Sequence, residues 1–149
     1  MIIKSVMPCT GELRENEFLL PVRVYYEDTD AGGIVYYANY LKFAERARTE
    51  FIRSLGVRQQ DELEGEDKFG FAVKHCEIDY KMPAVLDDEL VITVRVTDLK
   101  GASATMHQEI RRGEDVLAEI DITVVYLSLR QKRPVRMPRE LAAKIEQLM

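Results

Sequence analysis

The chain has 149 residues, 46% of them hydrophobic and 32% charged, which predicts one folded domain and excludes a disordered or fibrous chain. Its 21 basic and 26 acidic side chains give a net charge of −5, which argues against a broad nucleic-acid surface. The longest unbroken apolar run covers residues 31–38, whereas a membrane-spanning helix needs about 20 residues, so no membrane span is expected.

The N-terminal segment and the cysteines predict a cytoplasmic location. The first residues lack the apolar stretch of about 7–15 residues that marks a secretory signal peptide. Cys9 and Cys76 can form at most one disulfide, and free buried thiols in a reducing compartment are expected. Residues 1–17 are polar and irregular, which predicts a loosely ordered start.

The first regular elements predicted are a strand over residues 18–26 and a long helix. The helix is indicated by apolar side chains at spacings of three and four, and it is expected to begin between Ile34 and Asn39. Gly56 stands where a left-handed helix stop is expected. The periodic positions are Tyr40, Phe43, Ala44, Ala47, Phe51 and Leu55.

The rest of the chain alternates apolar and polar residues, as strands do. Short turns join the alternating runs, and this arrangement is typical of an antiparallel meander. A short polar helix or loop over 59–67 comes before these runs, and a C-terminal helix over 138–149 ends the chain. The predicted strands cover residues 69–80, 89–99, 104–110 and 116–126.

This order of elements predicts an α+β fold in which an antiparallel sheet of about five strands wraps around one long central helix. Edge strands of such a sheet commonly pair across subunits, so a homodimer is expected.

The junction between the first strand and the long helix carries the chemistry. Glu27, Asp28 and Asp30 precede two glycines and then the helix. Glycines leave backbone amides uncovered, and the first N–H groups of a helix are unpaired at the positive end of its dipole. Such donors stabilise an oxyanion, and a carboxylate close by acts as a base or nucleophile. The alternative is a plain helix cap or turn, although the apolar sequence at 31–38 predicts that the turn is buried or lines a cavity.

Residues 25–40, with Tyr-Glu-Asp-Thr-Asp-Ala-Gly-Gly at 26–33, resemble the signature of hotdog-fold acyl-CoA thioesterases of the 4-hydroxybenzoyl-CoA thioesterase type. The continuation Ala-Glu-Arg-Ala-Arg-Thr-Glu at 44–50 resembles the bacterial Tol-Pal-associated branch of that family. The resemblance covers residues 18–140 and implies a single hotdog domain over 1–149. It also implies an acyl-CoA substrate, no metal or organic cofactor, and a homodimer or a tetramer built from dimers.

The resemblance implies specific site residues. The catalytic carboxylate falls on Asp30, and the amide that polarises the thioester carbonyl falls on the backbone N–H of Tyr37, in the first turn of the helix. Asp30 would either attack the thioester to form an acyl-enzyme anhydride or activate a water, and the sequence leaves both routes open. Many members of the branch carry His at the position of Tyr37, a change to which a backbone donor is indifferent. The substrate-binding residues implied nearby are Gly32, Gly33, Val35, Tyr36 and Asn39.

A basic stretch near the C-terminus offers contacts for the phosphates of CoA. Family-like placement favours Lys100, Lys132 and Arg133 for this role. The alternative is a solvated basic tail that balances the acidic stretch at 61–67. The basic residues of the stretch are Arg130, Lys132, Arg133, Arg136 and Arg139.

The function predicted from the sequence is hydrolysis of acyl-CoA or aroyl-CoA thioesters to a free acid and CoA. An acyl-thioester hydratase or dehydratase is one alternative. A non-catalytic acyl-CoA-binding scaffold linked to lipid synthesis or the cell envelope is the other. His75 and His107 fall on different predicted strands without metal-ligand spacing, so neither is assigned to a metal site.

Overall fold

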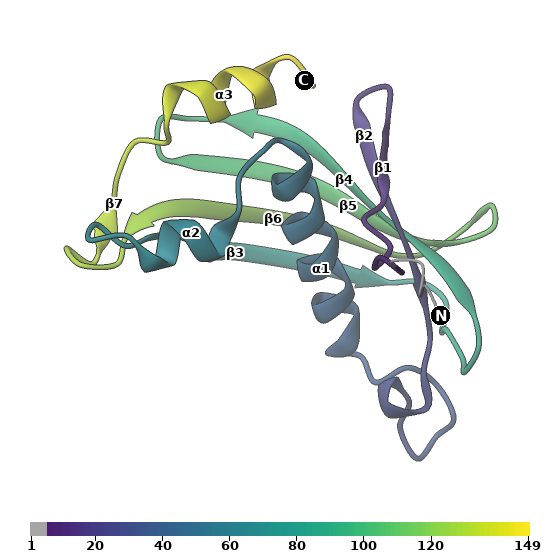
Figure 1. The fold of residues 1–149 in the computed structure, drawn as a ribbon. Helices are drawn as coiled ribbons and strands as arrows, with labels where there is room; N and C mark the ends of the chain where they lie inside the picture. Colours follow the sequence, from purple (N-terminus) through teal and green to yellow (C-terminus); the bar gives the residue numbers. More distant parts are fainter. Residues whose placement is uncertain (1–5) are drawn as a thin grey trace, which may run out of the picture.

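The computed structural model describes residues 6–149, which form a seven-stranded antiparallel sheet with α-helices packed across one face (Figure 1). The helices are α1 (Asn39–Ser54), α2 (Gln59–Glu64) and α3 (Arg139–Glu146), with a 3-10 turn, η1, at Tyr26–Asp28. The strands are β1 (Glu12–Arg14), β2 (Glu17–Arg23), β3 (Phe69–Tyr80), β4 (Glu89–Leu99), β5 (Ser103–Arg112), β6 (Asp115–Ser128) and β7 (Arg133–Pro134).

The predicted α+β architecture is confirmed, but the sheet has seven strands rather than about five. The two additional strands, β1 and β7, have only three and two residues, too few to show an alternating pattern. β1 lies within the segment expected to be irregular. The same expectation also covers residues 1–5, which lie outside the described residues.

The strand order is β1-β2-β4-β5-β6-β3, with β7 also paired to β6. The predicted meander therefore holds for β4, β5 and β6, whereas β3 lies at the far edge of the sheet beside β6. The pairing of β3 with β6 runs from Phe69 opposite Ser128 to Tyr80 opposite Ala118. No strand of residues 6–149 pairs with the other side of β3, so its outer backbone groups form a free edge.

α1 lies across the concave face of the sheet and begins at Asn39, within the predicted interval (Figure 1). Its apolar stripe is buried against β2, β4 and β5, as the spacing of three and four requires. The helix ends before Gly56, which adopts the expected left-handed conformation with φ +91°.

A buried polar group fastens α1 to the sheet. Gln108 of β5 has no exposed surface, and its side-chain amide donates to the carbonyls of Ala44 (3.1 Å) and Thr93 (3.2 Å). Its Oε1 accepts from Nη1 of Arg48 at 2.9 Å, and Arg48 also pairs with Glu45. Each of these buried groups therefore has a partner, which avoids the cost of an unsatisfied polar atom in a core.

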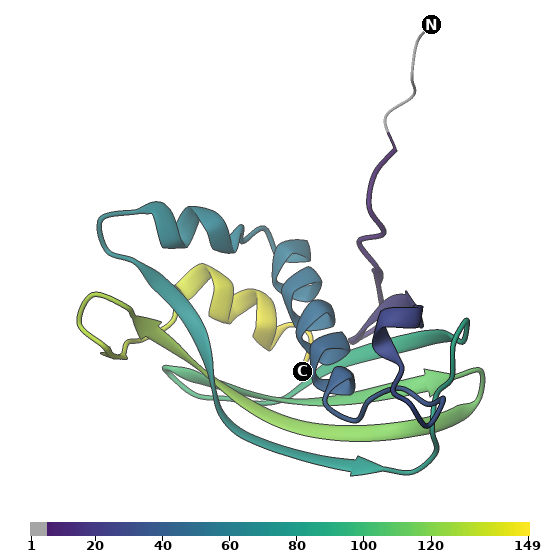
Figure 2. The ribbon, with the colours of Figure 1, turned by 90° about the horizontal axis from the view of Figure 1, so that it is seen from below.

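The helices occupy a single face of the sheet, and Figure 2 shows no helix of residues 6–149 on the opposite face. None of the described helices is long and apolar enough to cross a membrane.

Both cysteines are free, as expected, but the expectation that they are buried is wrong. Cys9 lies in the segment before β1, and Cys76 lies on the edge strand β3 within residues 73–77, all of which are exposed.

Candidate active site

The segment between β2 and α1 is a loop held tightly at one end of the sheet. The carbonyl of Asp28 accepts from the backbone N–H of Tyr36 (2.9 Å) and from Nδ2 of Asn39 (2.8 Å). The N–H of Val35 donates to the carbonyl of Ala84 (2.9 Å), in the connection between β3 and β4. Val35 and Asn39 are both buried, so these two predicted substrate-binding residues hold the loop in place through these hydrogen bonds.

Asp30 closes a tight turn at the tip of this loop. Its carbonyl accepts from the N–H of Gly33 (3.0 Å), and its Oδ1 accepts from the N–H of Gly32 (2.8 Å). The Asp30 side chain therefore does cap a turn, as the non-catalytic alternative predicts, but it uses only one oxygen. Its Oδ2 has no hydrogen-bond partner within residues 6–149, so this oxygen is available to a ligand.

The backbone N–H of Tyr37 is the second group that the resemblance singles out. It lies two residues before α1 rather than in the first helical turn, because the helix begins at Asn39. The carbonyl of Tyr36 accepts from the N–H of Asn39 at 2.8 Å, which fixes the peptide group between Tyr36 and Tyr37. In a planar trans peptide the N–H points away from the carbonyl, and here it has no acceptor among the described residues. Tyr37 thus presents an unpaired backbone donor.

Of the two expectations for this turn, that it is buried or that it lines a cavity, the first is wrong for a single chain. Tyr36 and Tyr37 are 46% and 62% exposed, and only Val35 of the apolar run is buried. The loop crosses the open end of the sheet instead of running between the sheet and α1, so one chain leaves its apolar side chains uncovered. Such a patch next to polar groups marks a surface where a ligand or partner binds.

Tyr80, the last residue of β3, belongs to the site but was missed from the sequence. Its hydroxyl donates to the carbonyl of Tyr37 at 2.9 Å, and its ring meets the rings of Tyr37 (6.1 Å between centroids) and Tyr40 (5.5 Å) edge to face. The partners are 43 residues apart in the chain, so no local sequence signal links them.

The residues predicted to contact CoA phosphates lie at the other end of the sheet. Lys100 directly follows β4, whose 11 residues span about 35 Å from the end near the Asp30 loop. There a hollow of about 680 Å³ is lined by Lys100 with Arg136 and Arg139. Lys132 and Arg133 are exposed in the turn that leads into β7 and at its start. One chain therefore does not bring any of these basic side chains to Asp30.

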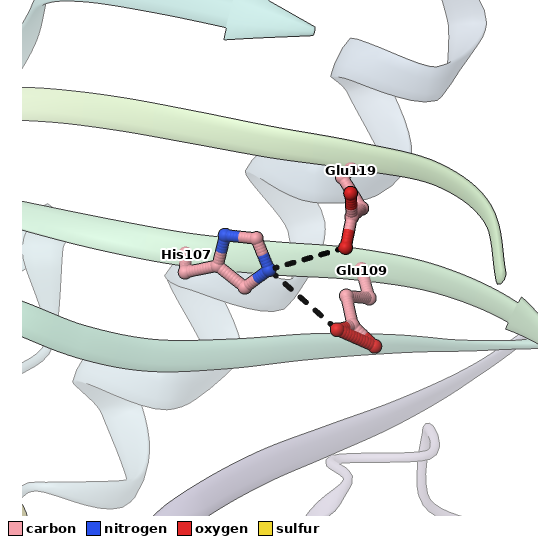
Figure 3. A group of neighbouring side chains, drawn as sticks. All are labelled: His107, Glu109 and Glu119. Atoms are coloured by element: carbon pink, nitrogen blue, oxygen red, sulfur yellow. Dashed lines mark ion pairs between the residues drawn. The ribbon is translucent and has the colours of Figure 1, made fainter. Parts of the chain in front are cut away.

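A group of His107, Glu109 and Glu119 on β5 and β6 has its ligand atoms close enough together to hold a metal ion (Figure 3). Nε2 of His107 lies 3.5 Å from Glu109 and 3.9 Å from Glu119. However, Arg111 (2.9 Å) and Lys81 (2.8 Å) already pair with these two carboxylates. Both carboxylates are therefore already paired with cationic side chains, and we assign no metal to the group.

Asp121 completes this network, since its carboxylate lies 2.9 Å from Nδ1 of His107. Burial by itself lowers the pKa of His107, but the hydrogen bond and charge of Asp121, together with Glu109 and Glu119, raise the pKa above its ordinary value.

Comparison with known proteins gives one consistent set of relatives. The family model of the Thioesterase-like superfamily matches residues 24–145. The acyl-CoA thioesterase YbgC of Haemophilus influenzae is 45% identical over 134 residues, which cover 90% of this chain and 98% of that protein. The long-chain acyl-CoA thioesterase FadM of Escherichia coli K12 is 33% identical over 116 residues, 75% of this chain and 84% of that protein. The crystal structure of a probable thioesterase from Bartonella henselae matches with a TM-score of 0.77 at 37% identity, covering 80% of this chain and 98% of that one.

Proposed function

The chain belongs to the thioesterase-like superfamily, and from this premise we propose that it hydrolyses acyl-CoA thioesters at Asp30 and Tyr37. The family and the hotdog fold expected from residues 25–50 are confirmed by the family model, the curated relatives and the solved structures. Acyl-CoA thioester hydrolysis is supported by the relatives that carry this activity in their names.

The observation that supports these two residues is that one loop presents a carboxylate oxygen and a backbone donor that both lack a partner within residues 6–149. The N–H of Tyr37 would donate to the thioester carbonyl oxygen and stabilise the negative charge that develops there. Oδ2 of Asp30 would act on the carbonyl carbon, while Oδ1 remains bonded to Gly32 and keeps the carboxylate in place.

Two routes with the same products fit this arrangement. In the first, Oδ2 of Asp30 attacks the carbonyl carbon, the carbon–sulfur bond breaks, and water then hydrolyses the resulting anhydride. In the second, Asp30 takes a proton from a water that attacks the same carbon. Either way the sulfur leaves as the thiol of CoA and the acyl group leaves as a free acid.

We further propose that the working form is a homodimer paired through β3. The free edge of β3 and the exposed apolar side chains near it, Val73 and Tyr80, favour an added strand. Two-fold pairing of β3 with itself is antiparallel, so the Phe69 end of one strand meets the Tyr80 end of the other. The end of the partner's sheet that carries the basic residues would then lie near Asp30. This supports Lys132 and Arg133 of the partner subunit as phosphate contacts.

The native mass distinguishes this dimer from a tetramer built from two such dimers. The cytoplasmic location predicted from the sequence is part of the proposal, since both thiols are free in the structure, as a reducing compartment would keep them.

The test is Asp30→Asn, assayed by release of free thiol from a panel of short-chain, long-chain and aroyl-CoA thioesters. We expect turnover to fall at least ~100-fold while the fold and native mass stay unchanged. The matched control is Glu27→Gln, which neutralises an exposed carboxylate of the same loop and is expected to retain wild-type turnover.

Near-normal turnover in Asp30→Asn would overturn the assignment of the carboxylate. A change in enoyl absorbance without thiol release would instead favour the hydratase or dehydratase. Tight binding of acyl-CoA without turnover of any thioester by the wild type would favour the non-catalytic scaffold.

A further inference from the structure

We propose that Tyr80 is a positioning residue for the hydrolysis, acting through the backbone of Tyr37. The inference rests on the proposed function, because it assumes that the N–H of Tyr37 donates to the thioester carbonyl. What the structure adds is a side chain from β3 whose hydroxyl bonds to the residue that carries this donor.

Two hydrogen bonds fix the two peptide groups on either side of the Tyr37 Cα atom. The carbonyl of Tyr36, in the preceding peptide, accepts from the N–H of Asn39 at 2.8 Å. The carbonyl of Tyr37, in the following peptide, accepts from the hydroxyl of Tyr80 at 2.9 Å. The N–H of Tyr37 belongs to the first of these groups, and the second joins that group to the start of α1. Because each group is planar, the two bonds together restrain the backbone angles at Tyr37 and keep its N–H in place relative to the helix.

Among the described residues, no backbone N–H of α1 donates to the second of these oxygens, the carbonyl oxygen of Tyr37. The N–H of Leu41 donates to the carbonyl of Ala38 at 3.2 Å, and the carbonyl of Tyr37 has no partner other than Tyr80 within residues 6–149. Removal of the Tyr80 hydroxyl would therefore leave the following peptide group free to rotate.

The ring of Tyr80 is itself held in a defined direction. It packs at 71° against the ring of Tyr40 and at 79° against that of Tyr37. Tyr40 is buried, and its hydroxyl accepts from the N–H of Ala84 at 3.0 Å, so it provides a fixed surface. Burial, and then the neighbours Tyr37, Cys76 and Tyr40, raise the pKa of Tyr80, which keeps the hydroxyl protonated as a donor.

The test is Tyr80→Phe, which keeps the ring and removes only the hydroxyl. We expect kcat for acyl-CoA hydrolysis to fall about 3- to 10-fold, the effect of one hydrogen bond, with KM unchanged and the variant still fully folded at the assay temperature. Tyr26→Phe is the matched control, since its hydroxyl is exposed on the same loop and has no partner within residues 6–149; it is expected to match the wild type.

A second variant, Tyr80→Leu, also removes the ring contacts and should lower kcat further than Tyr80→Phe. Wild-type kcat in Tyr80→Phe would overturn the inference, as would a loss explained by a rise in KM or by partial unfolding at the assay temperature. These results can be told apart from failure of the proposed function, which would show as an inactive wild type or an active Asp30→Asn variant.

Discussion

The N–H of Gly33 donates to the carbonyl of Asp30 at 3.0 Å across a turn in which Gly33 has φ +83°. A residue with a side chain rarely adopts this left-handed conformation, so the turn that holds Asp30 depends on glycine. The adjacent N–H of Gly32 orients the carboxylate through Oδ1. The backbone of Gly32 and Gly33 therefore determines the position of the Asp30 carboxylate.

Gly33→Ala is expected to strain this turn and to displace Asp30. A Cβ atom at Gly33 would meet no atom of residues 6–149 within 4 Å, so the cost is backbone strain of about 1 kcal/mol of unfolding free energy. Gly113→Ala is the control, because Gly113 has φ +60°, equally open surroundings and a place in the β5–β6 turn. Urea unfolding should show similar losses in both variants, whereas thiol release should fall only in Gly33→Ala. Equal turnover in the two variants would contradict this prediction.

The proposed dimer depends on the edge of β3, and Val73 tests it. Val73 lies in the middle of this strand and is half exposed, so Val73→Asp would place a charge in the interface. We expect the native mass of the variant to fall from twice the 17.2 kDa chain mass toward the mass of one chain. We also expect acyl-CoA hydrolysis to be lost. Leu13→Asp changes an exposed apolar residue of β1, at the opposite edge of the sheet, and should leave both unchanged. Sedimentation measures the mass, and a wild type at the chain mass would rule the dimer out.

His107 should make stability depend on pH. Its raised pKa means that its attraction to Asp121, Glu109 and Glu119 is fully present below the ordinary value of about 6.5 and is lost as the pH rises through the raised pKa. His107→Gln should therefore lower the unfolding free energy more at about pH 6 than at about pH 8.5. Lys81 and Arg111 keep their charge over this range and cannot produce the effect.

The control for this measurement is His75→Gln. His75 is 59% exposed at its side chain, and within residues 6–149 its one ion pair is with Glu77, so solvent screens the interaction. Its substitution removes an exposed imidazole outside the network, so the difference between the two pH values should be larger in His107→Gln than in His75→Gln. A His107→Gln effect that is equal at both pH values would show that the network contributes no pH dependence.

Much of the fold is determined by patterns that act over a few residues. The spacing of Phe43, Ala47 and Phe51 predicts α1, Gly56 predicts its end, and alternation predicts β3 and β4 with the bounds that the structure has. These patterns succeed because burial on one face of a helix or strand leaves a periodic trace in the sequence. The segment at 25–50 likewise indicates the family without any structure.

The tertiary structure decided the rest, because it depends on residues that are distant in the chain. The pairing of β3 with β6, the hydrogen bond from Tyr80 to Tyr37 and the link from Gln108 to Arg48 leave no periodic signal. Only the strand order shows that Lys100 and Asp30 lie at opposite ends of the sheet. Local periodicity and a local motif therefore suffice to predict the elements and the family. The folded chain alone shows which unpaired groups face a ligand, because that requires knowing which distant atoms have already satisfied each donor and acceptor.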